Sequence, residues 1–245
     1  MTCSHFPLIS PRRLLPVLIC WLAVRGIAWA SDAQTADSTI PSEGVREIIV
    51  VFKTHFDIGY TDFAESVVRN YGSSMIEAAL LNLDASQELP PEERFVWTLP
   101  AWPMQQIIDR SSQGTRSRVE TALINGNFAI HALPFTFETE ASDPENLARS
   151  FRFSTDISKK YGLELPRDAK MTDVPGHSWI IPTLFTHAGI KFYHMGGPVV
   201  NKDLGLPPFF WWEGPDGSRL LTLYNNGYGS DRLPPSDWPY KTWLF

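Results

Sequence analysis

Cysteine, basic clusters and long apolar runs are all scarce in this sequence, and each shortage excludes a class of protein. Its two cysteines, Cys3 and Cys20, both fall within the first twenty residues, so the rest of the chain offers no thiol for disulfides or cysteine metal sites. Lys and Arg total 21 against 27 Asp and Glu, a net charge of -6. No basic stripe is visible, which argues against nucleic acid as a partner.

The longest apolar run lies near the N-terminus and has the layout of an export signal. Two arginines precede the apolar residues 14–24, and Ala28-Trp-Ala30 is a small-x-small cleavage site. The run is shorter than the roughly 20 residues that a membrane-spanning helix needs. We therefore predict a signal peptide over residues 1–30 and a secreted or periplasmic protein with no stable membrane span once the leader is removed. An uncleaved anchor is the alternative.

Residues 46–245 have the composition of a folded α/β domain, and the polar residues 31–45 before them predict a flexible linker. The sequence is 43% apolar and 20% charged, which suffices to bury a core. Strand-like and helix-like segments alternate about five times, which predicts a parallel sheet, either a barrel or an open wound sheet. The predicted strands are 47–52, 95–99, 128–133, 168–173 and 190–195, and the predicted helices are 62–85, 104–109, 115–125, 142–161 and 179–188.

The end of the sequence departs from this alternation. Residues 209–213 and 219–224 are rich in strand formers and flank Gly214-Pro-Asp-Gly217, which predicts an antiparallel hairpin. No closing element follows before Phe245, so we expect a partial β/α barrel, truncated at its C-terminal end. An incomplete barrel exposes strand edges, so this chain alone is expected to be inactive and poorly soluble.

The motif Lys53-Thr-His-Phe-Asp57 carries the clearest chemical signal. It follows residues 47–52, which predict a strand buried on both faces, and it precedes Asp62-Phe-Ala-Glu65, which predicts a capping box at a helix start. His55 and Asp57 therefore lie where a strand ends, at the edge where α/β folds build their sites.

The spacing of His55 and Asp57 suits a metal ion. Two residues apart on an extended chain, they point to the same side, about 6.6 Å apart along the backbone. An imidazole and a carboxylate so placed can share a divalent ion, and imidazole favours zinc, copper, iron or nickel. The structural alternative is that His55 hydrogen-bonds a loop and Asp57 begins a turn.

Asp173 occupies an equivalent position, at the end of the predicted strand 168–173. In a closed barrel it faces the same cavity as His55, either as a third metal ligand or as a nucleophile that a neighbouring cation keeps ionised. The structural alternative is a turn-capping role before Pro175-Gly176. His177 is interpreted as a residue that orients a carboxylate from behind.

Three other histidines and the many aromatic residues have structural interpretations. His131 and His194 lie within predicted strands and are read as core or loop histidines rather than ligands. His187, late in a predicted helix, is interpreted as stabilising the helix dipole. The 9 tryptophans fit core filling first and stacking against sugar rings second.

Two motifs in order, with their surroundings, resemble glycoside hydrolase family 38, the α-mannosidases. His55-Phe-Asp-Ile-Gly-Tyr60 resembles the family's H-x-D-x-G-W motif on its first strand, and Asp173-Val-Pro-Gly-His-Ser178 resembles the D-x-F-G-H-S motif on a later strand. The helix–strand pair 182–192 and the hairpin 211–218 also resemble segments of that family. The resemblance covers residues 46–225.

The resemblance implies a seven-stranded β/α barrel of the glycoside hydrolase and deacetylase type, a zinc ion, and retaining hydrolysis of terminal α-mannosides. His55 and Asp57 would be zinc ligands, and Asp173 both a zinc ligand and the catalytic nucleophile. Tyr60 stands at the position of a tryptophan that stacks on the sugar, and we expect Tyr60 and His177 to bind substrate. The fourth zinc ligand and the general acid are expected beyond residue 245.

The sequence also departs from the family pattern. Val174-Pro175 replaces the usual x-Phe, and Tyr60 replaces tryptophan, which indicates a divergent branch whose sugar can differ from mannose. Two other functions share these motifs: a metal-dependent hydrolase of the polysaccharide deacetylase kind, and a carbohydrate-binding barrel without catalysis.

Overall fold

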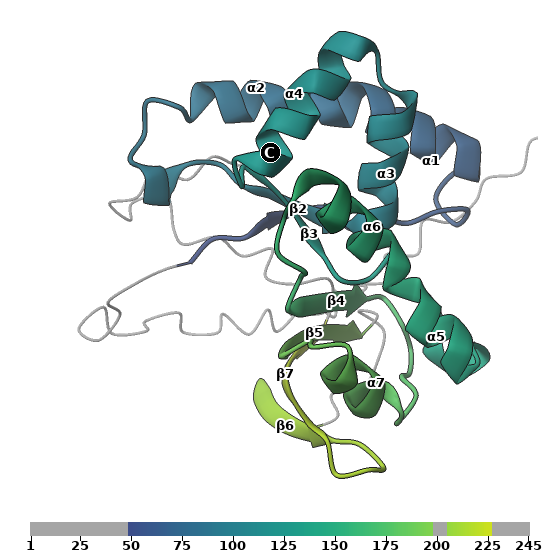
Figure 1. Cartoon of the computed structure of the whole chain (residues 1–245). Coiled ribbons are helices and arrows are strands. Elements are labelled where there is room, and N and C mark those ends of the chain that lie inside the picture. The colour runs from purple at the N-terminus through teal and green to yellow at the C-terminus, as the bar shows by residue number, and fades with distance from the viewer. Residues whose placement is uncertain (1–48, 198–204, 227–245) are drawn as a thin grey trace, which may run out of the picture. The chain divides into compact units, whose positions relative to one another are not determined.

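The computed structural model describes residues 49–197 and 205–226, which form a mixed α/β arrangement (Figure 1). The described residues belong to one compact unit that begins at Ile49. The predicted signal peptide over residues 1–30, and the linker after it, lie outside the described residues. Within the described ranges no helix is long and apolar enough to cross a membrane.

Parallel strands form two sheets. The strands are β1 (Phe52–Lys53), β2 (Trp97–Pro100), β3 (Phe128–His131), β4 (Asp168–Thr172), β5 (Phe192–Gly197), β6 (Phe209–Glu213) and β7 (Arg219–Asn226). The first sheet has the order β1-β2-β3 and the second β4-β5-β7-β6, and every pairing is parallel except that of β6 with β7. The Ala132 amide donates to the Asp168 carbonyl at 2.9 Å, which links the end of β3 to the start of β4.

Helices connect the strands and pack against the sheets. They are α1 (Ala64–Asn70), the π-helical turn η1 (Tyr71–Met75), α2 (Ile76–Ala85), α3 (Ala101–Arg110), α4 (Gln113–Ile124), α5 (Pro144–Ser150), α6 (Arg152–Tyr161) and α7 (Ile181–His187), with 3-10 turns η2 (Pro91–Glu93) and η3 (Thr139–Ala141). Figure 1 shows α1 to α4 over the first sheet and α7 beside β7. The alternation of strands and helices that the sequence predicted, with its parallel sheets and final hairpin, is confirmed.

The strands place apolar side chains on one face and polar side chains on the other. In β2, Trp97 and Leu99 are buried in the core formed with α3 and α4, and in β4 Ala169 and Met171 are buried in the core formed with α7. Because side chains alternate along a strand, the residues between them point to the opposite face. We call this opposite face the inner face. Strand register places its residues in four rows across neighbouring strands. These rows are Lys53, Thr98 and Ala129; Pro100 and His131; Lys170 and His194; and Thr172 and Gly196.

The prediction for the first strand is wrong in its extent and its burial. β1 spans two residues rather than 47–52, and Ile49, Val50 and Val51 are exposed rather than buried on both faces. The reason is that β1 is the edge of its sheet within the described residues, so its outer side has no strand partner there. Strand pairing among the described residues gives two separate sheets and does not show a closed barrel.

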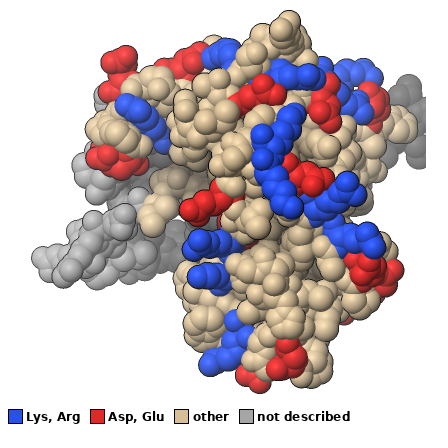
Figure 2. All heavy atoms as spheres, in the orientation of Figure 1, with Lys and Arg blue, Asp and Glu red and all other residues tan. Residues whose placement is uncertain are grey.

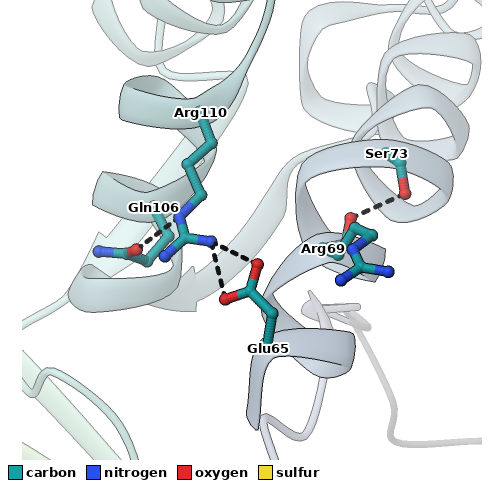
Figure 3. Close-up of polar contacts among 5 residues, drawn as sticks. All are labelled: Glu65, Arg69, Ser73, Gln106 and Arg110. Atoms are coloured by element: carbon teal, nitrogen blue, oxygen red, sulfur yellow. Dashed lines mark hydrogen bonds and ion pairs between the residues drawn. The ribbon is translucent and has the colours of Figure 1, made fainter. Parts of the chain in front are cut away.

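The predicted capping box at Asp62 and Glu65 is wrong. Helix α1 begins after Phe63 without a side-chain cap, and Asp62 accepts a hydrogen bond from the adjacent Phe63 amide instead. Figure 3 shows that Glu65 receives two hydrogen bonds from Arg110 on α3, at 3.1 and 3.2 Å, while Gln106 accepts from the same guanidinium at 3.1 Å. The Glu65 carboxylate therefore binds Arg110 in a tertiary contact between α1 and α3 instead of capping α1.

Two other helix starts differ from the predictions. The helix predicted over 104–109 begins three residues earlier, because Pro100 ends β2 and α3 begins at Ala101 with Pro103 in its first turn. Proline is tolerated there because first-turn amides have no partner within the helix. The helix predicted over 142–161 begins at Pro144 as α5, where Asp143 is the cap and accepts a hydrogen bond from the Asn146 amide at 2.8 Å.

Charged side chains are interspersed on the face of the molecule shown in Figure 2. Several form exposed ion pairs within one helix, such as Arg149 with Glu145 and Arg152 with Asp156. Exposed pairs of this kind contribute about 0.2–1 kcal/mol each, so the two apolar cores provide most of the stabilisation.

The turn between β6 and β7 is joined to α7 through the Asp216 carboxylate. Asp216 accepts hydrogen bonds from Thr183 at 2.6 Å and from the Ser218 amide at 3.0 Å, and it lies 3.1 Å from His187 Nε2. His187 therefore pairs with the hairpin turn in addition to sitting at the helix end. The turn approaches so closely that a Cβ on Gly214 would lie 2.9 Å from the Thr183 amide nitrogen.

We predict that Gly214→Ala destabilises the contact between the hairpin and α7 by about 1–3 kcal/mol, because the new methyl group overlaps the Thr183 backbone. Hydrogen–deuterium exchange on the full natural protein should show faster exchange in β6, β7 and α7. The matched control is Gly114→Ala in α4, where a Cβ meets nothing within 4 Å and where alanine favours the helix. Equal exchange in both variants would contradict the prediction.

Candidate active site

His55 follows β1, and aromatic packing fixes the backbone at this position. The Tyr71 hydroxyl donates to the His55 carbonyl oxygen at 3.3 Å. The Tyr71 ring, at the start of η1, meets the Phe56 ring edge to face with 5.0 Å between centroids, and both rings are buried. Such π-helical turns are frequent at functional sites. Here the turn presents the tyrosine that anchors the loop carrying His55.

Asp173 follows β4 in an unusual backbone conformation. Its φ of 67° makes it the one non-glycine residue with positive φ in the described part of the chain. Its amide donates to the Gly196 carbonyl at 2.9 Å, so hydrogen bonding to the end of β5 continues through it. Aspartate tolerates this left-handed region better than most residues, and non-glycine residues held there cluster at functional sites.

The left-handed conformation decides where the Asp173 side chain points. Strand alternation alone would direct this side chain to the face opposite the inner face, where Met171 is buried in the core. In the structure its carboxylate instead reaches the inner edge, where Oδ2 lies 3.7 Å from His55 Nε2. The two side chains retain 24% and 33% of their exposure, so the pair is partly shielded but open to a ligand.

Thr172 holds the other side of the His55 ring. Its Oγ1 lies 3.2 Å from His55 Nδ1, so both ring nitrogens of His55 have partners at the end of β4. Burial lowers the pKa of His55 below its ordinary value, and the charge of Asp173 opposes this shift in part. β1 and β4 are not neighbours in either sheet, so this contact requires the sheets to curl and bring the strand ends together across the inner face.

Comparison with protein families settles what kind of domain this is. The family model described as "Glycosyl hydrolases family 38 N-terminal domain" matches residues 46–237. The chain belongs to glycoside hydrolase family 38. The resemblance predicted from the two motifs is thereby confirmed, and the range of the match contains every residue of the site.

Solved structures of similar fold include family 38 proteins. An alpha-mannosidase from Enterococcus faecalis V583 matches with a TM-score of 0.58 and 18% identity, over 71% of this chain and 19% of that one. A protein of glycosyl hydrolase family 38 from Enterococcus faecalis matches with a TM-score of 0.50 and 16% identity, over 71% of this chain and 18% of that one. This family 38 chain thus spans about a fifth of those structures. A search of curated protein sequences gave no match.

The other predicted site residues of this family 38 chain take different positions. Asp57 is close enough to His55 for its charge to raise the histidine pKa. Tyr60 is 93% exposed, after Gly59 with φ 88°, so its ring is available to a ligand. His177 contacts the Tyr193 hydroxyl at 3.3 Å, and burial lowers its pKa to about 4. Its contact is therefore with a β5 tyrosine.

The predicted metal ligands come together only in part. His55 and Asp173 lie side by side, but the described residues contain no group of three or more His, Cys, Asp or Glu side chains arranged around one metal position. One imidazole and two carboxylates remain a donor set that suits zinc. Two of these donors are within 3.7 Å of each other, and the third follows His55 by two residues. The donor chemistry of the His55–Asp173 pair suits zinc, but in the described residues Asp57 does not join the pair around one metal position.

Sequence reasoning missed four residues that shape this site. Tyr71 and Thr172 hold His55, and two lysines, Lys53 and Lys170, line the same small cavity as His55. Burial and the charge of Lys53 lower the pKa of Lys170 to about 6. The alternation of side chains along a strand could have placed three of the four on the inner face. Lys53, Lys170 and Thr172 each share a strand face with another inner-face residue. Nothing local in the sequence identifies Tyr71.

The two strand histidines have the structural roles that the sequence predicted. His131 is 4% exposed, its Nδ1 accepts from the Leu133 amide at 3.3 Å, and burial lowers its pKa to about 3. His194 hydrogen-bonds through Nε2 to the Asn225 side chain. Both rings are therefore occupied within the fold.

Proposed function

We propose that this chain forms part of the active site of a zinc-dependent, retaining glycoside hydrolase that acts on α-mannoside-like carbohydrates. The observation that carries the proposal is the 3.7 Å contact between His55 and Asp173, two motif residues from distant strand ends. Membership of glycoside hydrolase family 38 and the fold shared with a protein titled as an alpha-mannosidase support it.

Asp173 has the chemistry of a nucleophile in this scheme. In retaining hydrolysis its carboxylate oxygen forms a bond to the anomeric carbon while the glycosidic C–O bond breaks, and a second carboxylic acid protonates the departing oxygen. Water then attacks the same carbon, releases Asp173 and gives its proton to that second residue. The positive φ that turns Asp173 toward His55 gives the carboxylate a fixed direction of attack, which supports this role.

His55, Asp57 and Asp173 are the residues that would hold zinc. When bound, zinc would polarise and position the hydroxyl groups of the sugar. The protein's own contribution is to fix the ligands: Thr172 holds His55 Nδ1 so that Nε2 faces Asp173. A hydrogen bond that fixes one ring nitrogen is the usual way in which proteins orient a ligating histidine.

The remaining substrate contacts and the complete fold belong to the same proposal. The exposed ring of Tyr60 would stack on a sugar, and His177 would support the wall of the site through Tyr193. The curl that brings β1 near β4 is of the kind that leads to a closed barrel of seven strands. The arginines, apolar run and small-x-small site of residues 1–30 support export by a signal peptide.

The test is hydrolysis by the full natural protein. We expect release of the aryl group from an aryl α-mannoside, and proton NMR should show the α-anomer as the first sugar product, because two inversions at the anomeric carbon retain configuration. Release of acetate from an acetylated polysaccharide without glycoside cleavage would instead identify a deacetylase. Sugar binding without turnover by the zinc-loaded protein would identify a binding protein.

A further inference from the structure

A groove lies between helices α2 and α4, which cover the face of the first sheet opposite the inner face (Figure 1). Its volume is about 350 Å³, and sites for small ligands usually measure about 300–1,000 Å³. The Asp84 carboxylate on α2 accepts two hydrogen bonds from Arg118 Nη2 on α4, both at 2.7 Å. This ion pair joins the two helices at the wall of the groove.

Helical spacing turns one face of each helix toward the groove. Leu80 and Asp84 lie four residues apart on α2, and Ser117, Thr121 and Asn125 follow one another at intervals of four along α4 and its C-terminal cap. Residues four apart share one face of a helix. The buried residues that form the apolar floor of the groove are Leu80, Leu83 and Ala122.

The polar residues that line the groove supply both hydrogen-bond donors and acceptors. Gln87 Nε2 donates to the Leu83 carbonyl at 3.1 Å, and Thr121 Oγ1 donates to the Ser117 carbonyl at 2.8 Å. The Gln87 amide oxygen and the Thr121 hydroxyl oxygen can therefore still accept. Within the described part of the chain, the hydrogen bonds of Arg118 use Nη2, so its other N–H groups can donate to a ligand.

The charges of the groove cancel, which favours a neutral ligand. Asp84 and Arg118 are the two charged residues among those that line it, and each offsets the field of the other. Each hydroxyl group of a sugar both donates and accepts a hydrogen bond, as this mixed set of partners requires. The C–H face of a sugar ring can lie on the apolar floor and exclude water from it.

The groove and the His55–Asp173 pair lie at opposite edges of the first sheet. His55 follows β1, whereas Asn127, which also lines the groove, precedes β3, and both strands run parallel to β2. The four residues of β3 span about 13 Å. A sugar unit in the groove is therefore out of reach of the carboxylate of Asp173.

We propose that this groove binds one neutral hexose unit of a glycan, separate from the unit that meets the His55–Asp173 pair. It would hold a long or branched carbohydrate on the protein while the strand ends act on another unit, because two linked contacts raise the overall affinity. The binding follows from the groove alone, and the link to catalysis is the part that rests on the proposed function.

The experiment is hydrogen–deuterium exchange of the full natural protein with and without D-mannose, D-glucose or D-galactose. Free hexoses have no glycosidic bond, so the result does not depend on hydrolysis. We expect at least one of them, at saturation, to slow exchange about threefold or more in peptides that cover residues 80–87 and 117–127, since binding stabilises the closed state of the segments it contacts. Glucuronate, which has the same ring with a negative charge, should slow these peptides less.

Two variants assign the effect to the groove. Arg118→Met and Asn125→Ala should each bring the ratio of exchange rates with and without sugar close to one in these peptides. Asn125 is exposed, and its side chain takes part in no hydrogen bond among the described residues, so this variant keeps the test decisive if Arg118→Met does not fold. The matched control is Arg149→Met, which breaks an exposed ion pair with Glu145 on α5 and should keep the full effect.

Three results would overturn the proposal. They are unchanged exchange in the groove peptides with all three hexoses, equal slowing in Asn125→Ala and the unaltered protein, and slowing by glucuronate that matches that of the best hexose. Because exchange is resolved along the chain, sugar bound near His55 and Asp173 would appear in other peptides. Failure of the groove and failure of the proposed hydrolysis are thus separate outcomes.

Discussion

Asp173→Asn should lower hydrolysis of an aryl α-mannoside by the full natural protein at least about a thousandfold, since removal of a catalytic nucleophile typically costs this much or more. Asparagine has nearly the shape of aspartate but lacks the negative oxygen that attacks the anomeric carbon. It also tolerates the positive φ that Asp173 adopts, so the backbone turn after β4 should survive. The loss should therefore appear in the rate of the chemical step.

The matched control for this experiment is Asp168→Asn. Asp168 lies at the opposite end of the same strand, away from His55, so the control should retain turnover within about a factor of two, as is usual for substitutions away from a site. Circular dichroism and thermal unfolding should be similar for both variants. Unchanged turnover in Asp173→Asn would exclude Asp173 as the nucleophile.

Covalent labelling gives an independent reading of the same residue. A fluorinated glycoside that slows the second step should leave a sugar attached to Asp173, detectable by peptide mass spectrometry, because a retaining enzyme passes through a glycosyl-enzyme. A deacetylase forms no such species, so labelling at Asp173 also separates the two hydrolase mechanisms.

His55→Ala should reduce the affinity of the full natural protein for zinc at least about a hundredfold, since even residues that only support a metal ligand are worth 10–100-fold. Elemental analysis after dialysis against a weak chelator should find close to one zinc per molecule in the unaltered protein and little in the variant. This readout does not depend on activity, and a competing zinc dye can give the affinity ratio directly.

The control for metal binding is His187→Ala. His187 is also a histidine beside a carboxylate, 3.1 Å from Asp216, but it lies at the hairpin turn rather than at the strand ends. The control should keep its zinc. Full zinc content in His55→Ala, or an unaltered protein that binds none, would remove the metal from the proposal. Asp57→Asn tests the third ligand separately. A clear loss of bound zinc in this variant would show that Asp57 joins the other two ligands when metal is present.

Much of the local structure could be predicted because it depends on neighbours in sequence. The hairpin around Gly214-Pro-Asp-Gly217, the end of α6 at Gly162 and the strand before Asp173 all follow from turn residues and side-chain period. The predictions failed where a distant residue competed for the same group. Glu65 binds Arg110 instead of capping its own helix, and no local pattern reveals that partner.

The sequence by itself determined the family, the order of strands and helices, and the two motifs that place His55 and Asp173 at strand ends. Only the tertiary structure decided that these two side chains meet, that Thr172 and Tyr71 hold the histidine, and that Lys53 and Lys170 line one cavity with it. The physical reason is that period and turn chemistry act over a few residues, whereas the curl of a sheet depends on how all its strands and covering helices pack together. Asp173 illustrates the difference, because only its left-handed backbone turns the carboxylate toward His55.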